Sequence, residues 1–417
     1  MEVVVQKFGG TCVDSEPNQL LSAERIMEAR DRGLHPVVVV SAMGREGQPY
    51  STAELVKTVR RIAPRIEPRE LDLLMSCGEI ISTVAMAHLL QTKGYETIAL
   101  SGGQVRLVTD EFFGHARIVR IEPEPLLRAL QDGYMVFVAG FQGITADHQI
   151  TTLGAGGSDY TAVALTRVIQ ETPKLPFGEK LEVAPLQIYK QVNGVMTANP
   201  ESLGEAGAAR TVTALTYDEC VWMSRLGAEV LQQEAAEMAR EHRIPLTIRN
   251  FRDSDTPGTT VGTSGTAAKE DRATAIADEA RLLVFDLDSK NDRRVLQIKE
   301  SLGRERLTYY HLTTNGPHVR LAVAPFKYRD VRSIVGQVLA SRGVSSPINA
   351  GDFALVSVVG EGLRQRLEVW AEEAERILSA ERIEVHGITQ DEISLSYLVE
   401  ESKRNQAVSS LHERLVL

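Results

Sequence analysis

The sequence has little cysteine, few aromatic residues and an excess of acidic over basic side chains. Its three cysteines, Cys12, Cys77 and Cys220, are far apart and form no CxxC pair. Scattered cysteines in odd number exclude a disulfide framework and a zinc site, and they fit a reducing compartment. The formal net charge of −10 argues against nucleic-acid binding, because a nucleic-acid binder normally needs a basic face. The same charge argues against an anionic membrane surface.

Long apolar runs are also missing. No apolar stretch approaches the ~20 residues of a membrane span. The start, MEVVVQKFGGT, shows no basic segment followed by a long apolar one, so a signal peptide is not expected. We therefore expect a soluble protein of the cytoplasm with no membrane segment. At 417 residues, the chain is too long for one ordinary core, and two or three domains are expected.

Residues up to about 265 alternate short apolar runs with amphipathic stretches. Such runs are typical of parallel strands buried on both faces, with helices between them. Because ligands bind beyond the carboxyl ends of such strands, KFGGT, VVSAMG, ALSGG, AGFQG and TTLGAGGSD are the candidate ligand-binding loops. The expected strands lie at residues 2–8, 36–42, 96–102, 134–141, 186–192 and 245–251.

The amino-acid composition changes at residues 253–273, where turn-forming and polar residues indicate a linker. Beyond it, the strand and helix pattern repeats after about 70 residues, which is typical of two tandem α+β sandwiches. We predict domains at residues 1–265, 274–345 and 346–417. The last segment of the chain is a candidate to complete the 274–345 domain.

Two short motifs carry candidate chemistry, and each has a structural explanation beside the functional one. Lys7 ends a strand just before Gly9 and Gly10, so that an ammonium and backbone N–H groups can meet phosphate oxygens. A purely structural glycine turn is the more common explanation for such a pair. Glu79 in SCGEIIS (76–82) stands at an expected helix start. There an acid more commonly serves the helix macrodipole, and the alternative is a carboxylate that holds a substrate ammonium.

The strongest local motif is TTLGAGGSDYTAVAL (151–165). Its glycines lead into an amphipathic helix, which makes an anion-receptive helix N-terminus, and Ser158 and Asp159 stand where an N-cap is expected. Asp159 is either a first-turn acid or a group that orients a nucleophile or a lysine. Ala155 occupies the position where an anionic substrate needs a cation.

Taken in order, these motifs resemble aspartate kinase, a member of the amino acid kinase family, over nearly the whole chain. The C-terminal repeat, with VSVVGEGLR, looks like that family's tandem ACT domains. The resemblance implies an α/β fold, in which an amino acid kinase (carbamate kinase-like) αβα sandwich is followed by two α+β ferredoxin-like ACT domains. The matching segments are VVQKFGGT, VVVVSAMGREGQPYST, LLMSCGEIIS, VAGFQG, TTLGxGGSDYTAVAL, NGVMTANP, LGAEVL and PGTTVGTS.

The reaction that this resemblance implies is ATP-dependent phosphorylation of the L-aspartate side chain to 4-phospho-L-aspartate. It is the first step of lysine, threonine and methionine (diaminopimelate) biosynthesis. Because a carboxylate with a pKa of about 4 is already ionised at neutral pH, the reaction needs positioning and charge neutralisation rather than a general base. The resemblance further implies Mg²⁺ carried by ATP, no metal site of the protein itself, an amino-acid effector, and a homodimer or higher oligomer through the ACT domains.

The resemblance also implies roles for individual residues. Lys7 would neutralise the transferring phosphoryl group, and Asp159 would orient Lys7. Glu79 would hold the substrate ammonium, and the substrate would also meet Thr52, Gly156, Gly157 and Ser158. The residues expected to bind ATP are Lys7, Phe8, Gly9, Gly10, Lys190, Gln191, Met196, Thr197, Ala198, Asn199 and Pro200.

Several positions depart from the family pattern. Ala155 replaces an arginine that pairs with a carboxylate of aspartate. Removing one partner of a buried charge pair costs roughly 2–5 kcal/mol, so this loss alone implies a roughly 30- to 4000-fold penalty. The other departures replace residues that the family uses on its nucleotide side, and they are Lys190-Gln191 for Thr-Asp, Glu201 for arginine, Glu229 for lysine and Gln232-Gln233 for His-Pro.

The ACT region departs as well. Its segments DSKNDRRVL and GEGLRQRLEVW lack the family's Pro-Gly turn, which argues against feedback by lysine or threonine. Two alternatives therefore stand beside an active aspartate kinase. One is a kinase of the same fold for a different carboxylate or amine, suggested by Ala155 beside Glu79. The other is a catalytically impaired regulatory paralogue that acts through its ACT pair.

Overall fold

The chain folds into two units in this computed structural model, which describes residues 1–203, 209–263, 272–288, 292–314, 316, 318–326 and 329–416. The first unit contains Met1–Val195 and Leu231–Thr263, and the second contains Met196–Val230 and the described residues from 272 onward. Residues 196–230 therefore group with the C-terminal part, although they precede the expected linker. Residues 264–271 of that linker and 289–291 of DSKNDRRVL lie outside the described residues.

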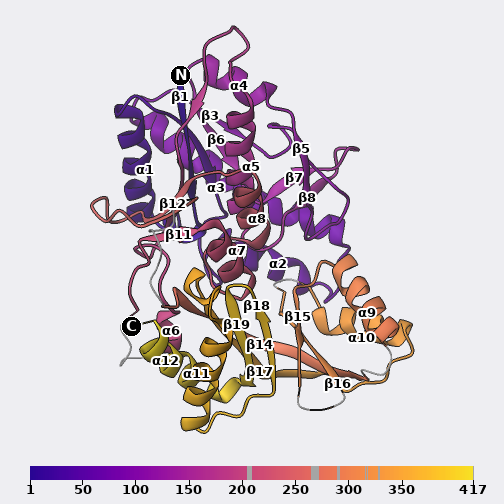
Figure 1. Cartoon of the computed structure of the whole chain (residues 1–417). Helices are drawn as coiled ribbons and strands as arrows, with labels where there is room; N and C mark the ends of the chain where they lie inside the picture. Colours follow the sequence, from indigo (N-terminus) through magenta and orange to yellow (C-terminus); the bar gives the residue numbers. More distant parts are fainter. Residues whose placement is uncertain are drawn as a thin grey trace. The chain divides into compact units, whose positions relative to one another are not determined.

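A mainly parallel sheet forms the centre of the first unit (Figure 1). Among the strands of this sheet that belong to the first unit, neighbours are parallel except β12 with β13. Every strand predicted for this unit is present, and the expected α/β fold is confirmed. The order across the sheet is β3 (Thr97–Leu100), β6 (Met135–Ala139), β2 (His35–Val40), β1 (Glu2–Phe8), β10 (Leu186–Lys190), β12 (Leu246–Asn250) and β13 (Thr259–Gly262), and β9 (Glu182–Val183) also pairs with β1.

Helices cover both faces of this sheet. On one face, α1 (Glu16–Asp31) and α3 (Pro68–Thr92) bury their apolar side chains against Phe8 and Phe137. On the other face lies α5 (Gly157–Glu171), with α8 (Gln233–Glu241) packed beside it. Lys7 reaches α5 because successive residues of a strand point to opposite faces. The other elements of this unit are η1 (Gly10–Cys12), α2 (Thr52–Arg60), α4 (Glu124–Gln131) and a small sheet of β5 (Ile118–Ile121), β4 (Leu107–Thr109), β7 (Gln142–Ile144) and β8 (Ile150–Thr152).

Helix α3 is long and apolar enough to cross a membrane by length and composition, and half of its most apolar stretch is buried inside the protein. The expectation that no stretch reaches this length was therefore wrong. In this structure α3 packs against β3, β6 and β8. It also carries two buried acids, Asp72 and Glu79, each of which accepts hydrogen bonds from other segments of this unit. These contacts are those of a core helix.

The C-terminal part of the second unit contains two ferredoxin-like α+β sandwiches, as predicted. Both share one antiparallel sheet, and the long strands β14 and β17 each take part in both halves. The start of β14, residues 275–279, completes the second half by pairing with β17. The sheet order is β15 (Tyr309–Leu312), β16 (His318–Val323), β14 (Ala275–Asp288), β17 (Asn349–Val359), β19 (Ser394–Glu400) and β18 (Gly387–Asp391), covered by α9 (Asp292–Arg304), α10 (Val331–Ser341), α11 (Leu367–Ala380) and α12 (Arg404–Leu415).

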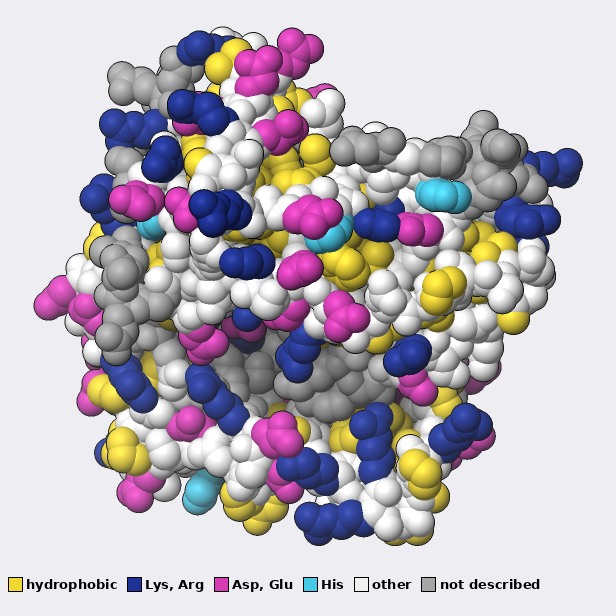
Figure 2. Space-filling view, turned by 90° about the horizontal axis from the view of Figure 1, so that it is seen from below, with side chains coloured by type: hydrophobic (Ala, Val, Ile, Leu, Met, Phe, Trp, Pro, Cys, Tyr) yellow, Lys and Arg dark blue, Asp and Glu magenta, His cyan; other side chains and the backbone are white. Residues whose placement is uncertain are grey.

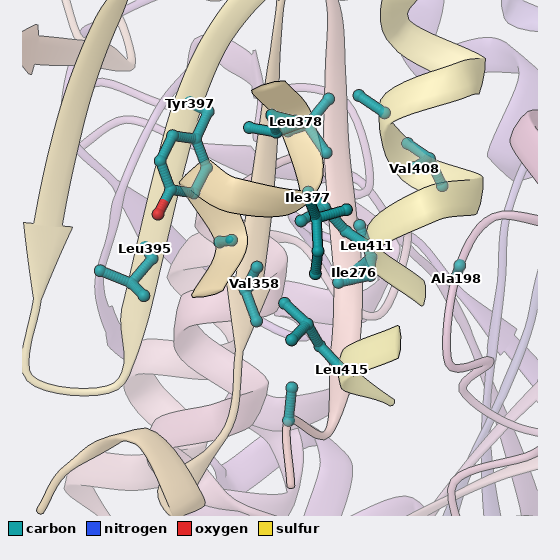
Figure 3. Packing of buried hydrophobic residues seen from close by; sticks show 14 of the residues in the cluster. Ala198, Ile276, Val358, Ile377, Leu378, Leu395, Tyr397, Val408, Leu411 and Leu415 are labelled. Carbon is teal, nitrogen blue, oxygen red and sulfur yellow. The ribbon is translucent and has the colours of Figure 1, made fainter. Parts of the chain in front are cut away.

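The last helix, α12, packs with the second sandwich. Figure 3 shows its residues Val408, Leu411 and Leu415 close to Ile377 of α11 and Val358 of β17. Helices α9 and α10 pack on the first sandwich and form a separate core. The segment from Met196 joins this unit through α6 (Pro200–Leu203), β11 (Ala214–Thr216) and α7 (Tyr217–Arg225), and the short helices η2 (Glu361–Leu363) and η3 (Glu401–Lys403) complete it.

Charged side chains of both signs are mixed on the surface. On the face shown in Figure 2, Lys and Arg side chains are interspersed with Asp and Glu, and hydrophobic side chains form small groups between them. Over the residues that the structure describes, this face lacks the single-sign field that draws a polyanion.

Candidate active site

A buried ion pair joins the central sheet to helix α5. The Nζ of Lys7, at the carboxyl end of β1, lies 2.6 Å from Oδ1 of Asp159, and both side chains are less than a tenth exposed. Asp159 lies in the first turn of α5, where a negative charge is stabilised by the helix dipole. The structure therefore brings together the two residues that the sequence predicts as the catalytic pair, although they are far apart along the chain.

The turn after β1 explains why two glycines follow the strand. A Cβ on Gly10 would lie 2.5 Å from the carbonyl oxygen of Ala42, so only glycine fits this close approach. The amide of Gly44 donates to the Gly10 carbonyl at 3.1 Å. Gly9 is more open, and its Cβ position lies 3.7 Å from the ammonium of Lys7. Close packing thus requires glycine at position 10, whereas a Cβ at position 9 would make only ordinary contacts, one of them with the Lys7 ammonium.

Glu79 lies in the middle of α3, because that helix begins at Pro68. The expected helix start at Glu79 was therefore wrong, and a role at the helix N-terminus falls away. Its Oε1 accepts a hydrogen bond from the Ala42 amide at 3.0 Å. Its Oε2 is buried and accepts none from any described residue. Because this oxygen has no partner among the described residues, it is available to a ligand ammonium. Burial raises the pKa of the Glu79 carboxyl to about 8, so the carboxyl must lose its proton to meet an ammonium as a carboxylate.

The glycine loop after β8 turns sharply into α5. Gly154 and Gly156 both have positive φ, which favours glycine over other residues. A Cβ on Gly154 would also lie 2.5 Å from Nδ1 of His115. Gly156 is the N-cap of α5, so Ser158 and Asp159 lie inside the first turn and the expected N-cap at those two residues was wrong. The side chain of Ala155 is exposed.

The remaining predicted substrate residues lie around this loop and the loop after β2. Ser158 is buried, and its Oγ lies 2.6 Å from the Cβ position of Gly140 at the end of β6. Gly157 packs equally closely on Leu153. Thr52 is the first residue of α2 and is half-buried. Gly140 follows the parallel strand β6, whereas the glycine loop follows β8, which pairs antiparallel with β7 in the small sheet.

Three residues that hold the glycine loop were not predicted as site residues. Asp72 is fully buried and accepts hydrogen bonds from the amides of Gly114 and Thr152 at 2.9 and 2.8 Å. Burial raises the pKa of Asp72 to about 6. His115 Nε2 lies 2.7 Å from Glu234 Oε1. No local sequence signal exists for these contacts, because Asp72 and Thr152 are 80 positions apart and His115 and Glu234 are 119 apart.

Gln232, which the sequence shows as a departure from the family pattern, also supports this loop. Its Nε2 donates to the Leu153 carbonyl at 2.8 Å, and its Cβ lies 3.1 Å from the Cβ position of Gly156. The side chain is mostly buried. Gln232 therefore holds the glycine loop through its backbone at Leu153, before α5 begins.

The predicted nucleotide residues divide between the two units. In the first unit, the Phe8 ring is buried and stacks on Tyr189 with 4.7 Å between ring centroids, Lys190 ends β10, and Gln191 accepts a hydrogen bond from Arg45 at 2.9 Å. Met196 through Pro200 belong to the second unit.

In that second unit, the 196–200 segment is bound to the C-terminal part. Thr197 Oγ1 lies 2.8 Å from His412 Nε2, and the Ala198 side chain is buried in the core of the second sandwich, as Figure 3 shows. Met196 bridges to Thr211, Asn199 Oδ1 accepts from the Glu201 amide at 3.0 Å, and Pro200 begins α6. The part of these residues in ATP binding stays a prediction.

Comparison with known proteins gives a consistent result. The model of the amino acid kinase family matches residues 2–250, and an ACT domain model matches residues 356–415. The chain is 33% identical to the aspartokinase of Geobacillus stearothermophilus over 425 residues, which is 99% of this chain and 97% of that protein. It is 34% identical to the aspartokinase of Bacillus sp. (strain MGA3) over 428 residues, with 100% and 98% covered. Among solved structures, E. coli aspartokinase III in complex with aspartate and ADP (R-state) has a TM-score of 0.77, 22% identity and 99% coverage of both chains.

Proposed function

Because this chain belongs to the aspartokinase branch of the amino acid kinase family, we propose that it transfers a phosphoryl group from ATP to the side-chain carboxylate of L-aspartate. The products are 4-phospho-L-aspartate and ADP. The observation that carries the proposal is the buried Lys7–Asp159 pair, whose ammonium lies beside the open backbone of Gly9. A strand end with a lysine and free backbone amides is a site for phosphate oxygens.

We propose the following roles for this chain's own residues. Lys7 neutralises negative charge on the transferring phosphoryl group, and Asp159 holds the ammonium in place at 2.6 Å. Glu79 binds the ammonium of aspartate through its buried Oε2, which accepts no hydrogen bond from any described residue. The attacking carboxylate is ionised at neutral pH without help, so the protein supplies position and charge rather than a base. ATP brings Mg²⁺, which would neutralise further phosphate charge.

The direct test traps the product. With ATP, Mg²⁺, L-aspartate and hydroxylamine, the purified protein is expected to form aspartyl hydroxamate, and omission of any one substrate is expected to abolish the signal. Absence of hydroxamate, together with absence of ATP binding in calorimetry, would contradict the proposed function and favour a regulatory paralogue.

Glu79 makes aspartate binding depend on pH. Its pKa of about 8 in the folded protein lies well above the ordinary value of 4.5, so ammonium binding must release a proton below pH 8. We expect KM for aspartate to fall as pH rises from 6 to 8, by up to about tenfold per unit. Glu79→Gln should bind aspartate weakly and show a flat profile, and Glu70→Gln, an exposed acid of the same helix, should keep the wild-type profile. A wild-type profile in Glu79→Gln would contradict this role.

The same residue affects the free protein. An acid whose pKa is raised on folding contributes stability that is lost as pH rises from its unfolded value toward its folded one. Because of Glu79, the free energy of unfolding therefore falls as pH rises from 4.5 to about 8. Glu79→Gln should melt at a higher temperature than wild type at pH 8, with a smaller difference at pH 5.

The wider assignment follows from the family. We propose that the protein acts in the cytoplasm, in the first step of lysine, threonine and methionine biosynthesis. The domain bounds proposed are 1–265 for the kinase domain and 274–345 and 346–417 for the ACT domains. The ACT domains are the proposed place of homodimer formation and of an amino-acid effector.

A further inference from the structure

A phosphate-binding turn needs more positive charge than Lys7 alone supplies here. The ammonium of Lys7 already lies 2.6 Å from the Asp159 carboxylate, which offsets part of the positive charge that Lys7 offers to phosphate. At two family positions on the nucleotide side where cations are usual, this chain has Glu201 and Glu229. Under the proposed function, a second cation in the first unit is therefore expected near Gly9 and Gly10.

The loop after β2 lies directly against this turn. Its Ala42 carbonyl is only 2.5 Å from the Cβ position of Gly10, and its Gly44 amide donates to the Gly10 carbonyl at 3.1 Å. The same loop reaches Glu79 through the Ala42 amide at 3.0 Å. Residues 42–44 thus connect the candidate ammonium site with the glycine turn, and their position is fixed from both sides.

Arg45 is the next residue of this loop. Its backbone amide donates to Gln48 Oε1 at 2.6 Å, and its guanidinium Nη2 donates to Gln191 Oε1 at 2.9 Å. Gln191 in turn donates to the carbonyl of Thr11, which directly follows Gly10, at 3.4 Å. The guanidinium is therefore held on the Thr11 side of the glycine turn, whereas Lys7 lies on the Gly9 side.

The charge of Arg45 is not neutralised by a carboxylate. Its guanidinium partner is the neutral amide of Gln191, and none of the described carboxylates lies within 4.0 Å of it. The family pattern has an aspartate at position 191, beside which an arginine would be compensated. We propose that Arg45 is the second cation of the glycine turn and binds the terminal phosphates of ATP through its guanidinium fork.

The alternative is an exposed arginine with a surface hydrogen bond and no ligand. The two explanations differ in which nucleotides respond to its removal. A group that contacts terminal phosphates matters for ATP and not for AMP, whereas a group that only shapes the loop affects both. Loss of a charge-assisted hydrogen bond is expected to weaken ATP binding about tenfold or more.

The experiment is calorimetry with ATP, ADP and AMP on wild type, Arg45→Gln, Arg45→Lys and the exposed control Arg61→Gln. Arg45→Gln should bind ATP at least about tenfold more weakly, bind AMP as wild type does, and lose part of the salt dependence of ATP binding. Arg45→Lys should bind ATP with an affinity between those of wild type and Arg45→Gln, because it keeps the positive charge but loses the paired N–H donors of the guanidinium. Melting temperatures confirm that the variants are folded.

Two results would overturn the inference while leaving the proposed function standing. One is ATP affinity in Arg45→Gln equal to that of wild type, and the other is an equal loss for ATP and AMP. A wild-type protein that binds none of the three nucleotides would instead overturn the proposed function, and the inference with it.

Discussion

Replacing Lys7 with alanine is expected to lower kcat/KM for aspartyl phosphate formation by about 10²- to 10³-fold, an effect of the size seen when one preorganised charge-stabilising group is removed from an active site. The reason is the position of the ammonium, which lies 3.7 Å from the Cβ position of Gly9 in the turn where we propose that phosphate binds. The hydroxamate assay and a coupled assay for ADP release both measure the loss. Lys180→Ala is the control, because Lys180 is an exposed lysine near the opposite end of β1.

The same substitution should also destabilise the fold, and a second variant separates the two effects. Lys7→Ala leaves the buried Asp159 carboxylate without its partner, which costs about 3–5 kcal/mol. Adding Asp159→Asn removes that orphan charge, so the double variant should recover much of the free energy of unfolding without recovering activity. If the double variant regained activity together with stability, Lys7 would be structural only. Activity of Lys7→Ala within tenfold of wild type would lead to the same conclusion.

The first unit could be predicted well from sequence because its signals are local. Buried parallel strands are short continuous apolar runs, and each predicted strand is present. Their carboxyl ends meet at one edge of the sheet, which is why Lys7 and the loop after β2 were expected together. The glycine loop was expected at the same edge, but it follows β8, which pairs antiparallel with β7 in the small sheet. It reaches Lys7 through Asp159 in the first turn of α5. The start of the helix that contains Glu79 was harder to predict, because SCGEIIS contains a glycine and serines, which also occur at helix starts. In the structure Gly78 is needed for a different reason, since its Cβ would lie 2.8 Å from the Cβ of Ala42.

Contacts between distant residues could not be predicted from one sequence. Arg45 and Gln191 are 146 positions apart, and Asp72 and Gly114 are 42 apart. A surface arginine and a helical aspartate have no local pattern that names their partners. These partners follow only once the strand order is known, because that order decides which loops become neighbours.

The second unit shows the same limit at the level of whole strands. The internal repeat predicted two α+β sandwiches, and both are present. The repeat does not reveal that β14 serves both halves, with residues 275–279 on the second and 283–288 on the first. A strand of 14 residues has length for two pairings, and only the register on each side distinguishes them. This sharing joins the halves into one sheet.

The second large prediction concerns position 155, where Ala155 replaces the arginine of the family pattern. Its side chain is exposed between two glycines of positive φ, so an arginine can be added without displacing a buried group. If the substrate is aspartate and only the arginine that pairs with its carboxylate is missing, Ala155→Arg should lower KM for aspartate. Because position 155 is exposed, the gain should be up to roughly 30-fold, the lower end of what a buried charge pair contributes. Steady-state kinetics at saturating ATP measure the change.

The control for this variant is Ala155→Gln, which adds length and hydrogen-bonding capacity without charge. Both variants should be assayed with L-aspartate and with its α-amide, which keeps the ammonium and the reacting carboxylate but lacks the α-carboxylate. If the added arginine pairs with the α-carboxylate, Ala155→Arg should lower KM for aspartate and not for the amide. Ala155→Gln should lower KM for neither substrate. If wild type already preferred the amide and Ala155→Arg reduced that activity, the loop would serve a different substrate from aspartate. The exposed alanine would then be the specificity determinant of a repurposed kinase, because the intact Glu79 and Lys7 sites recognise only the ammonium and the phosphoryl group that both substrates share.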